Sequence, residues 1–267
     1  MNKQKAPKGI EWTRVYDRDG YTWNPVGGCH HGCQWQMPDG TIAECYAKTV
    51  SEKFGIHEQG FEHHYFYPER LREPVKLKKG AGIFLDSMSD LMGHWVADSE
   101  IQQVLDVCHD TPQHIYFLLT KNAIRLKKFK FPDNVWIGAS SPPDFYKGEK
   151  LSQLQKDQML KVTLDALGQT NATVKWMSFE PLSTDYSEIV KEHPVLNWAV
   201  IGAASQGRKY IPPNRDDFQS LMAVLKGQHV PVFFKGNMES LPDAKNNWLV
   251  EFPPEKKPGV QLDMFQF

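Results

Sequence analysis

The sequence predicts an α/β fold: a full or partial (β/α) barrel followed by a disordered C-terminal tail. Two features of the chain lead to this fold class. Short, continuously apolar, β-rich segments recur from residue 83 onward, and helical patterns with apolar residues at i, i+3, i+4 and i+7 lie between them. Alternating strands and helices with right-handed crossovers form either an open parallel sheet or a barrel. No Gly-x-Gly-x-x-Gly motif follows any predicted strand, which favours the barrel.

The predicted strands are continuous rather than alternating apolar runs, which is typical of parallel strands covered on both faces. They are Ile83–Leu85, Ile115–Leu119, Val135–Gly138, Val174–Phe179, Trp198–Gly202 and Val230–Phe234, with Tyr21–Val26 as a further candidate. The predicted helices carry apolar stripes through Ile101–Cys108, Leu160–Leu167 and Phe218–Leu225. Ser99 and Gln102 are placed as a capping box for the first of these helices.

Composition and charge limit the class of protein. The chain has 267 residues, of which 40% are hydrophobic, with 31 Lys and Arg against 32 Asp and Glu. That is enough apolar material for one large domain or two small ones at roughly 100–200 residues each, and it excludes a disordered or coiled-coil protein. Because the net charge is −1, any contact with nucleic acid must come from a local patch.

The ends and the apolar runs of the chain indicate its location and its domain limits. The longest apolar run, Trp198–Ala204, is far shorter than the ~20 residues of a membrane helix, and the lysine-rich N-terminus lacks the apolar part of a secretory signal. We therefore expect a cytoplasmic protein with no membrane partner. We expect residues 1–250 to form the barrel domain, with a cysteine loop near its N-terminus, and residues 251–267 to form a Pro-rich linker and tail.

Polar side chains follow the predicted strands at their carboxyl ends, where barrels and open α/β sheets bind their ligands. Each one alone is more typical of turn or cap chemistry, but their recurrence at one end of the sheet predicts a shared pocket. Glu180 comes directly after a buried strand, so its carboxylate needs a partner or a ligand. The strand-end residues are Asp86, Ser87, Ser89, Asp90, Thr120, Lys121, Ser140, Ser141, Ser178, Glu180, Ser205 and Lys235.

Three cysteines, Cys29, Cys33 and Cys45, lie close together in a Gly-rich segment. Thiolates select zinc or iron–sulfur clusters, and a structural zinc site has four Cys or His ligands. His30 and His31 are too constrained beside Cys29 to complete such a site, and Cys108 is placed on the apolar face of a predicted helix as a core residue. Three cysteines without a fourth ligand predict a 4Fe–4S cluster with one open iron, with zinc or free thiols as the alternatives.

The chain resembles a family of phage-borne, three-cysteine, radical-SAM-like proteins of unassigned function. The matching segments occur in the order of that family over about residues 9–240, so the resemblance covers most of the chain. They are Gly9-Ile-Glu-Trp-Thr13, Thr22-Trp-Asn-Pro-Val26, Gly28-Cys29, Cys45-Tyr-Ala47, Ser87-Met-Ser-Asp-Leu91, Leu119-Thr-Lys121, Asn134-Val-Trp-Ile-Gly138, Ser178-Phe-Glu-Pro-Leu182, Trp198-Ala-Val-Ile-Gly202 and Phe233-Phe-Lys235.

The resemblance implies a radical-SAM-like barrel in which the three cysteines hold a 4Fe–4S cluster whose open iron binds S-adenosylmethionine. In that chemistry the reduced cluster cleaves the cofactor to a 5′-deoxyadenosyl radical, which abstracts hydrogen from a substrate. The residues that it implies for cofactor binding are Ser87, Ser89, Asp90, Glu180 and Ser205, and those left for substrate binding are Thr120, Lys121, Ser140 and Lys235.

Two positions depart from the patterns of these proteins. The segment Gln34–Glu44 separates the second and third cysteines, where the wider radical-SAM pattern has only a short spacer. The family's Gly-Gly-Glu-Ser near the sixth predicted strand is Gly202-Ala-Ala-Ser205 here and lacks the acid.

Two basic segments, Arg70–Lys79 and Lys121–Lys130, flank predicted strand ends. Such local patches can bind phosphates even on a neutral protein, and the alternative is a solvated helix face. The tail ends in Gln261, Leu262, Asp263, Met264 and Phe265, which resembles the short motif by which bacterial polymerases and repair proteins bind the β sliding clamp. Leu262, Met264 and Phe265 would fill an apolar pocket, and the Pro-rich linker would leave the peptide free to reach it.

Together these features predict an iron–sulfur, radical-SAM-like enzyme that acts on nucleic acid in DNA repair or modification and is recruited by the bacterial β sliding clamp. A zinc-dependent barrel enzyme is one alternative. A non-catalytic, clamp-associated DNA-binding module with a structural metal site is the other.

Overall fold

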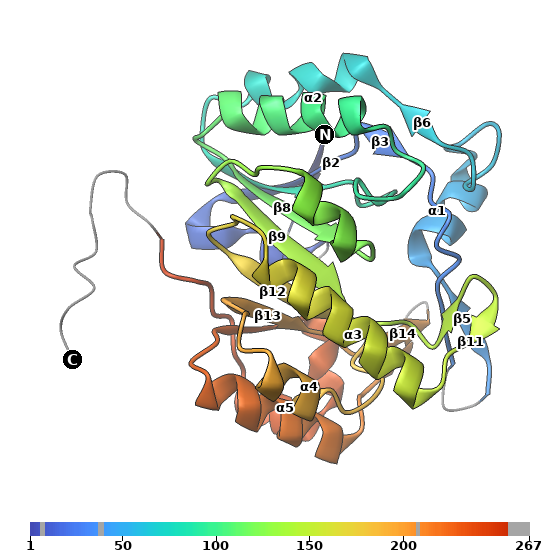
Figure 1. Ribbon diagram of the computed structural model, residues 1–267, viewed down its shortest axis with the longest axis vertical. Coiled ribbons are helices and arrows are strands. Elements are labelled where there is room, and N and C mark those ends of the chain that lie inside the picture. Colours follow the sequence, from blue (N-terminus) through green and yellow to red (C-terminus); the bar gives the residue numbers. More distant parts are fainter. Residues whose placement is uncertain (6–8, 37–39, 207–208, 256–267) are drawn as a thin grey trace.

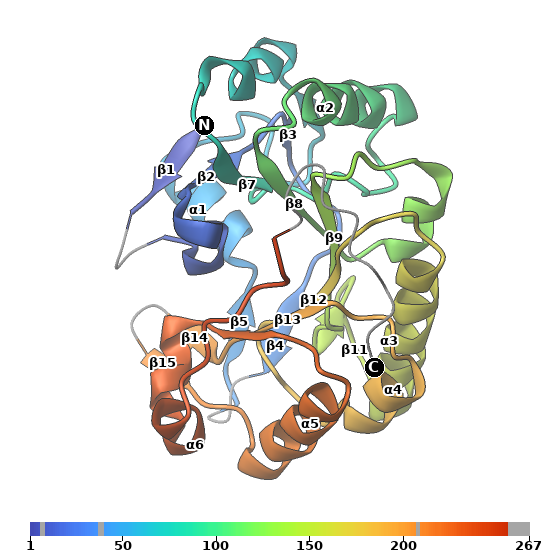
Figure 2. The same ribbon diagram turned by 90° about the vertical axis from the view of Figure 1, so that its left-hand side faces the viewer.

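The computed structural model describes residues 1–5, 9–36, 40–206 and 209–255. Its centre is an eight-stranded sheet that curls into a partial barrel (Figures 1 and 2), as the sequence predicts. In spatial order the strands are β1 (Asn2–Gln4), β2 (Asp19–Trp23), β7 (Ala81–Leu85), β8 (Ile115–Thr120), β9 (Val135–Ser140), β12 (Lys175–Phe179), β13 (Trp198–Ile201) and β16 (Val232–Phe234). β1 is antiparallel to β2, and every other neighbouring pair in this sheet is parallel.

All six predicted strands are present, and the further candidate Tyr21–Val26 overlaps β2. Their burial explains why continuous apolar runs identified them: every residue of β7 and β13 is buried. Because the parallel strands all end at the same edge of the sheet, the polar residues that follow them are brought together there.

The helices are α1 (Tyr46–Phe54), α2 (Asp98–Asp110), α3 (Gln153–Gly168), α4 (Ser187–Glu192), α5 (Arg215–Gly227) and α6 (Pro242–Asn246). Short 3₁₀ helices connect them: η1 (Glu11–Thr13), η2 (Val15–Asp17), η3 (Pro68–Arg72), η4 (Pro74–Lys76), η5 (Ala123–Lys128) and η6 (Gly236–Ser240). The three predicted apolar stripes lie on α2, α3 and α5. The predicted capping box is wrong, because α2 already begins at Asp98, and it is the Glu100 carboxylate that accepts a hydrogen bond from the Ala97 backbone N–H at 3.0 Å.

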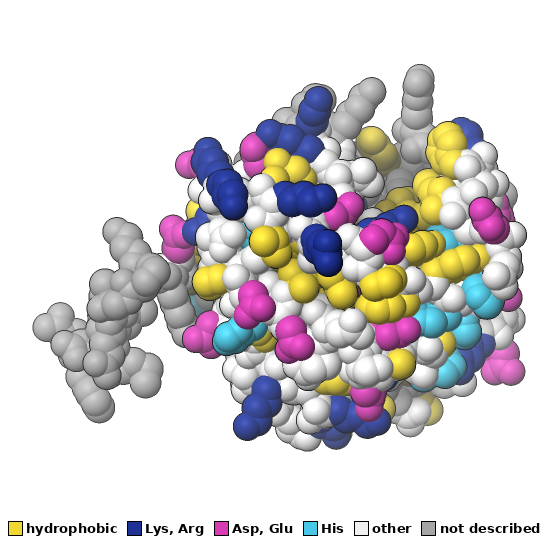
Figure 3. Space-filling model, turned by 90° about the horizontal axis from the view of Figure 1, so that it is seen from above, with side chains coloured by type: hydrophobic (Ala, Val, Ile, Leu, Met, Phe, Trp, Pro, Cys, Tyr) yellow, Lys and Arg dark blue, Asp and Glu magenta, His cyan; other side chains and the backbone are white. Residues whose placement is uncertain are grey.

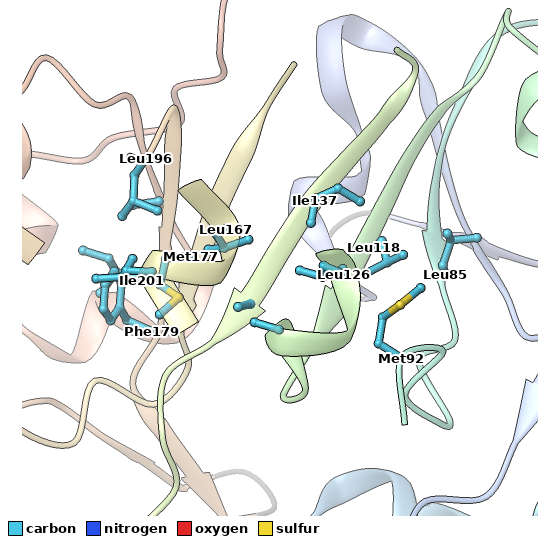
Figure 4. Packing of buried hydrophobic residues seen from close by; sticks show 14 of the residues in the cluster. Leu85, Met92, Leu118, Leu126, Ile137, Leu167, Met177, Phe179, Leu196 and Ile201 are labelled. Carbon is cyan, nitrogen blue, oxygen red and sulfur yellow. The ribbon is translucent and has the colours of Figure 1, made fainter. Parts of the chain in front are cut away.

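The larger hydrophobic cluster packs the strands against the helices. Figure 4 shows Leu118, Ile137 and Met177 of the strands in this cluster, together with Leu126 of η5 and Leu167 of α3. Cys108 of α2 is fully buried in the same cluster, which confirms that it is a core residue.

A second cluster of large rings fills the inside of the curled sheet. Trp12 of η1 packs edge-to-face on Phe84 at 4.8 Å and on Trp176 at 5.2 Å between ring centroids. Glycine is required at position 138 of β9, because an added Cβ would lie 2.2 Å from the Trp176 ring. The remaining large rings of this cluster are Phe117, Trp136, Trp198 and Phe233. Two of its rings, Trp12 and Phe84, also line the cavity described below.

Three small sheets flank the barrel. One has four strands in the order β11 (Glu149–Lys150), β10 (Phe145–Tyr146), β4 (Gln34–Gln36) and β5 (Ile42–Glu44). The other two pair β3 (Val26–Gly27) with β6 (Tyr65–Phe66), and β14 (Ala204–Gln206) with β15 (Lys209–Ile211).

The segment 250–255 lies against the barrel. Val250 forms a β-bridge with Phe233, the Phe252 ring lies 5.5 Å from that of Trp198, and Glu255 pairs with Arg18 at 2.6 Å. The clamp-like motif Gln261–Phe265 lies outside the described residues. In the described part of the chain, no helix combines the length and the apolar character that crossing a membrane requires.

Candidate functional site

A cavity of about 700 Å³ opens at the carboxyl ends of the parallel strands, which is a usual size for a small-molecule site. The structure brings together in its walls every metal, cofactor and substrate candidate that the sequence predicts. These are Cys29, Cys33, Cys45, Ser87, Ser89, Asp90, Thr120, Lys121, Ser140, Glu180, Ser205 and Lys235. Trp12 and Phe84 of the inner aromatic cluster line the same cavity. The individual roles of these side chains stay predictions.

The segment between Cys33 and Cys45 contains two strands that form a hairpin. Its strands β4 and β5 pair antiparallel, with Gln34 opposite Glu44. Because Gln34 follows Cys33 and Glu44 precedes Cys45, this register places the two cysteines next to each other at the open end of a hairpin. The insertion therefore lengthens the chain between the cysteines without separating them in space.

The hairpin is fixed to the rest of the barrel through β10. Phe145 of β10 pairs with Gln34, and the Lys147 backbone N–H donates to the His31 carbonyl oxygen at 3.2 Å. Asp144 accepts a hydrogen bond from the Gln36 backbone N–H and pairs with Lys156 of α3 at 2.5 Å. These contacts attach the cysteine segment to β10 and, through Asp144, to α3.

The first cysteine follows a glycine that no other residue can replace without strain. Gly28 has φ +79°, and an added Cβ would lie 1.8 Å from the His63 carbonyl oxygen. The close approach of the chain at this point lets the Cys29 backbone N–H donate to the Phe61 carbonyl oxygen at 2.8 Å. The segment 61–63 therefore packs against the backbone of Gly28 and Cys29.

Asp90 joins the cysteine segment to the end of β8. Its Oδ2 accepts hydrogen bonds from the Thr120 hydroxyl at 3.0 Å and from the Lys121 backbone N–H at 2.8 Å, and it lies 2.7 Å from His31 Nε2. His31 Nδ1 lies 3.1 Å from the Tyr146 hydroxyl. Asp90 is buried, but these interactions outweigh the effect of burial and hold its pKa below the ordinary value. Asp90 and Thr120 line the cavity and also position the segment that carries the cysteines.

Ser87 and Ser89 also bind the chain near the cysteines. The Ser87 hydroxyl donates to Asn24 Oδ1 at 3.1 Å, and the Ser89 hydroxyl donates to the Gly28 carbonyl oxygen at 2.5 Å. Asn24 Oδ1 accepts a second hydrogen bond, from the Met88 backbone N–H at 3.1 Å. The hydrogen bonds of the two serines therefore connect the end of β7 to the start of the cysteine segment.

Burial keeps two of the cysteine thiols protonated. It raises the pKa of Cys33 to about 11, against the opposing charge of Lys121, and it raises the pKa of Cys29 further. Burial would lower the pKa of Lys121, but the nearby Cys33, Cys45 and Asp90 raise it above its ordinary value. A cationic metal centre would replace the thiol protons and supply the charge that stabilises thiolates here.

The three cysteines bring thiol groups, the ligands that zinc and iron–sulfur clusters share, to one cavity. Among the described residues, no three His, Cys, Asp or Glu side chains converge closely enough to hold one metal ion. A zinc ion needs each thiolate about 2.3 Å from one point. In a cuboidal cluster each thiolate binds a different iron, so the three sulfur atoms would not have to converge on one point.

Glu180 and Lys235 form an ion pair on another part of the cavity wall, at the ends of β12 and β16. Lys235 Nζ donates to Glu180 Oε2 at 2.8 Å, and Glu180 Oε1 is buried without a hydrogen-bond partner among the described residues. Burial would lower the pKa of Lys235, but the charge and hydrogen bond of Glu180 raise it above its ordinary value. The pair offers a ligand one acceptor oxygen beside an ammonium group.

Three residues contribute to the site without having been assigned a binding role from the sequence: Asn24, His31 and Asp86. Asn24 follows β2, which the sequence marks only as a further candidate strand. His31 enters the sequence argument only as a fourth metal ligand, and its contact with Asp90 joins positions far apart in sequence. Asp86 is one of the predicted strand-end residues. It is buried at φ +53° and accepts from the Val26 N–H, while its Oδ2 has no partner among the described residues.

Solved structures of one enzyme share this architecture. The fold is similar to that of a cysteine-to-serine mutant of spore photoproduct lyase, with a TM-score of 0.50 and 9% identity, covering 87% of this chain and 80% of the lyase. A tyrosine-to-phenylalanine mutant of the lyase gives the same TM-score and coverage with 8% identity. The lyase complexed with dinucleoside spore photoproduct gives a TM-score of 0.48 and 9% identity, covering 84% and 78% of the two chains. At these identities the likeness concerns the fold alone.

One of the sequence comparisons identifies the family of this chain. None of the curated proteins matches the sequence. A family model described as a protein of unknown function (DUF5131) matches residues 8–247. This match includes all parallel strands of the barrel, the cysteine segment and the whole cavity lining from Gly9 onward. The chain therefore belongs to the DUF5131 family of proteins of unknown function.

Proposed function

We propose that this protein is a radical-SAM-like enzyme that acts on DNA in repair or modification and is recruited by the bacterial β sliding clamp. The observation that carries the enzymatic part is the position of three thiols, Cys29, Cys33 and Cys45, in one wall of a cavity at the carboxyl ends of a partial barrel. In this proposal the thiols hold a 4Fe–4S cluster, and S-adenosylmethionine occupies the cavity beside it. The cluster would supply the one-electron chemistry that cleaves this cofactor.

Three features of the chain support the cluster over a structural metal site. The hairpin β4–β5 brings Cys33 and Cys45 together although they are distant in sequence. The cavity is large enough for a small-molecule cofactor and reaches from the thiols to the Glu180–Lys235 pair. Two rings of the inner aromatic cluster, Trp12 and Phe84, give the cavity an apolar surface, which suits chemistry that must be kept from water.

Anaerobic reconstitution with iron and sulfide tests the cluster. We expect about four irons per chain and a broad absorption band near 400 nm. Cys29→Ala, Cys33→Ala and Cys45→Ala should each abolish iron binding, because each removes one thiolate. Cys108→Ala is the matched control and should keep its iron, since Cys108 is buried in the larger hydrophobic cluster. Colourless protein with one zinc per chain would refute the proposal, as would loss of iron in the Cys108 variant.

Turnover of S-adenosylmethionine to 5′-deoxyadenosine after reduction separates an enzyme from a binding module. Glu180→Gln should keep the fold and the iron content, because the amide preserves the volume, but it should lose cofactor binding or turnover with the charge. A fully active Glu180→Gln protein would give Glu180 a structural role only. Iron-loaded wild-type protein that never cleaves the cofactor would favour the non-catalytic module.

Nucleic acid as the substrate class is supported by fold likeness and by local charge. The fold is similar to that of spore photoproduct lyase, an enzyme whose name gives a photoproduct as its substrate, and Lys121 of the second basic segment reaches into the cavity wall. Outside the cavity, Lys and Arg side chains are interspersed with Asp and Glu on the face seen in Figure 3. Cofactor cleavage measured with damaged or modified DNA, and with the matching RNA, tests this part and the choice between DNA and RNA.

Recruitment by the clamp rests on the tail sequence Gln261–Phe265 and on the Pro-rich segment before it. An isolated peptide of this kind should bind at about micromolar strength, or about 8 kcal/mol. Deleting residues 261–267, or combining Leu262→Ala with Phe265→Ala, should abolish binding to the β clamp in a calorimetric titration while iron content stays intact. Equal affinity with and without the tail would refute clamp recruitment.

A further inference from the structure

A second, smaller cavity of about 310 Å³ adjoins the first one. The two cavities share Asn2, Asn24, Ile56 and Met88 as lining residues, so these residues lie between the two spaces. The small cavity contains none of the three cysteines and none of the predicted cofactor or substrate residues. Its remaining lining residues are Met1, Val26, Gly27, His57, Tyr67, Arg70 and Glu73.

Arg70 is the charged group of this cavity that lacks a counterion among the described residues. Its Nη1 donates to the Asn24 carbonyl oxygen at 2.9 Å, and its guanidinium lies 3.8 Å from the centroid of the Tyr67 ring. No carboxylate of the described residues lies within ion-pair distance of it, and its other N–H groups have no protein acceptor there. Glu73, the one carboxylate among the described lining residues, pairs instead with the amino group of Met1 at 2.6 Å.

The surroundings orient this guanidinium for an anion. The Tyr67 ring covers one face of the guanidinium plane, and the Asn24 carbonyl oxygen accepts a hydrogen bond at one edge of it. The remaining N–H groups of the guanidinium point away from both. A planar fork of N–H donors in fixed orientation matches the oxygens of a phosphate, which it can bind at two points. Burial lowers the pKa of His57, and the positive charge of Arg70 lowers it further.

We infer that the small cavity is a phosphate-binding subsite centred on Arg70. The identity of the phosphate as part of a nucleic-acid strand rests on the proposed function, in which it would flank the nucleotide on which the enzyme acts. A phosphate at Arg70 would fix the register of the strand without reading its sequence, as backbone contacts in nucleic-acid complexes do.

The test compares protein variants with ligands that differ only in charge. Short single-stranded DNA with ordinary phosphodiesters is compared with the same DNA carrying one neutral methylphosphonate, placed at each linkage in turn, using the wild-type protein, Arg70→Gln and Arg72→Gln. Arg72 is the matched control, because it lies on the same 3₁₀ helix and is exposed. We expect the wild-type protein and Arg72→Gln to prefer the charged strand by about tenfold, the usual effect of one charge-assisted contact, and Arg70→Gln to lose that preference.

Inorganic phosphate distinguishes failure of this inference from failure of the proposed function. If phosphate raises the melting temperature of the wild-type protein and of Arg72→Gln but not of Arg70→Gln, the subsite is supported even when no DNA binds, and the source is then a free phosphate rather than a strand. Arg70→Lys keeps the charge and should retain part of the preference, which guards against misfolding of Arg70→Gln. Phosphate and DNA binding that are the same in Arg70→Gln as in the wild-type protein would overturn the inference.

Discussion

Replacing Asp86 by Asn should stabilise the protein without its cofactor. Asp86 is 3% exposed, only one of its carboxyl oxygens has a partner among the described residues, and burial raises its pKa well above the ordinary value of 3.8. Asn keeps the volume, keeps an acceptor for the Val26 N–H, and tolerates the left-handed backbone at φ +53°. What it removes is the ionisable group.

The size of the effect follows from the direction of the pKa shift. Below the ordinary carboxyl pKa, Asp86 is protonated in both folded and unfolded protein, and the substitution should change little. As the pH rises above it, the unfolded chain loses its proton while the folded protein retains it, so the wild-type free energy of unfolding falls by about 1.4 kcal/mol for each pH unit until the raised pKa is reached. The Asp86→Asn protein escapes this loss, so its advantage in stability over the wild-type protein should grow with pH by up to about 1.4 kcal/mol per pH unit.

Urea denaturation of the metal-free proteins between pH 3.5 and 6 measures this difference. Asp133→Asn is the control for the same change of residue at an exposed position. A constant difference between Asp86→Asn and the wild-type protein across this range would contradict the reasoning. So would lower stability of Asp86→Asn at every pH. The first result would mean that the pKa of Asp86 is the same in the folded and unfolded protein, and the second that the Asp86 carboxyl group makes a favourable interaction which Asn cannot replace.

Two further substitutions test the supports of the site. Asp90→Ala should lower the free energy of unfolding by about 3–5 kcal/mol and reduce iron loading, because it leaves buried donors of His31 and Thr120 without their acceptor. Asp19→Ala, which removes an exposed ion pair with Lys3, should cost less than about 1 kcal/mol in the same urea titration. Gly138→Ala should lower the stability by about 1–3 kcal/mol or more, because its Cβ would lie 2.2 Å from the Trp176 ring, and unchanged thermal unfolding would refute that contact.

The position of the cysteines shows where sequence reasoning reached its limit. Thiol chemistry alone indicated a soft metal centre, because residue type determines which metals a site prefers. The long spacing between Cys33 and Cys45 looked like a departure from the pattern. Only the antiparallel register of Gln34 with Glu44 shows that the two thiols stay together, and β4 also pairs with β10, from a segment more than a hundred residues later.

The sequence by itself determined the fold class and the composition of the cavity wall. Continuous apolar runs mark strands that are buried on both faces, and parallel strands must end at one edge, so the polar residues after them were bound to meet. The tertiary structure decided which of those residues are already engaged, as Asp90 is with His31, and which still have a free group, as Asp86, Glu180 and Arg70 do among the described residues. Hydrogen bonds between distant segments leave no periodic pattern in a sequence, whereas burial does.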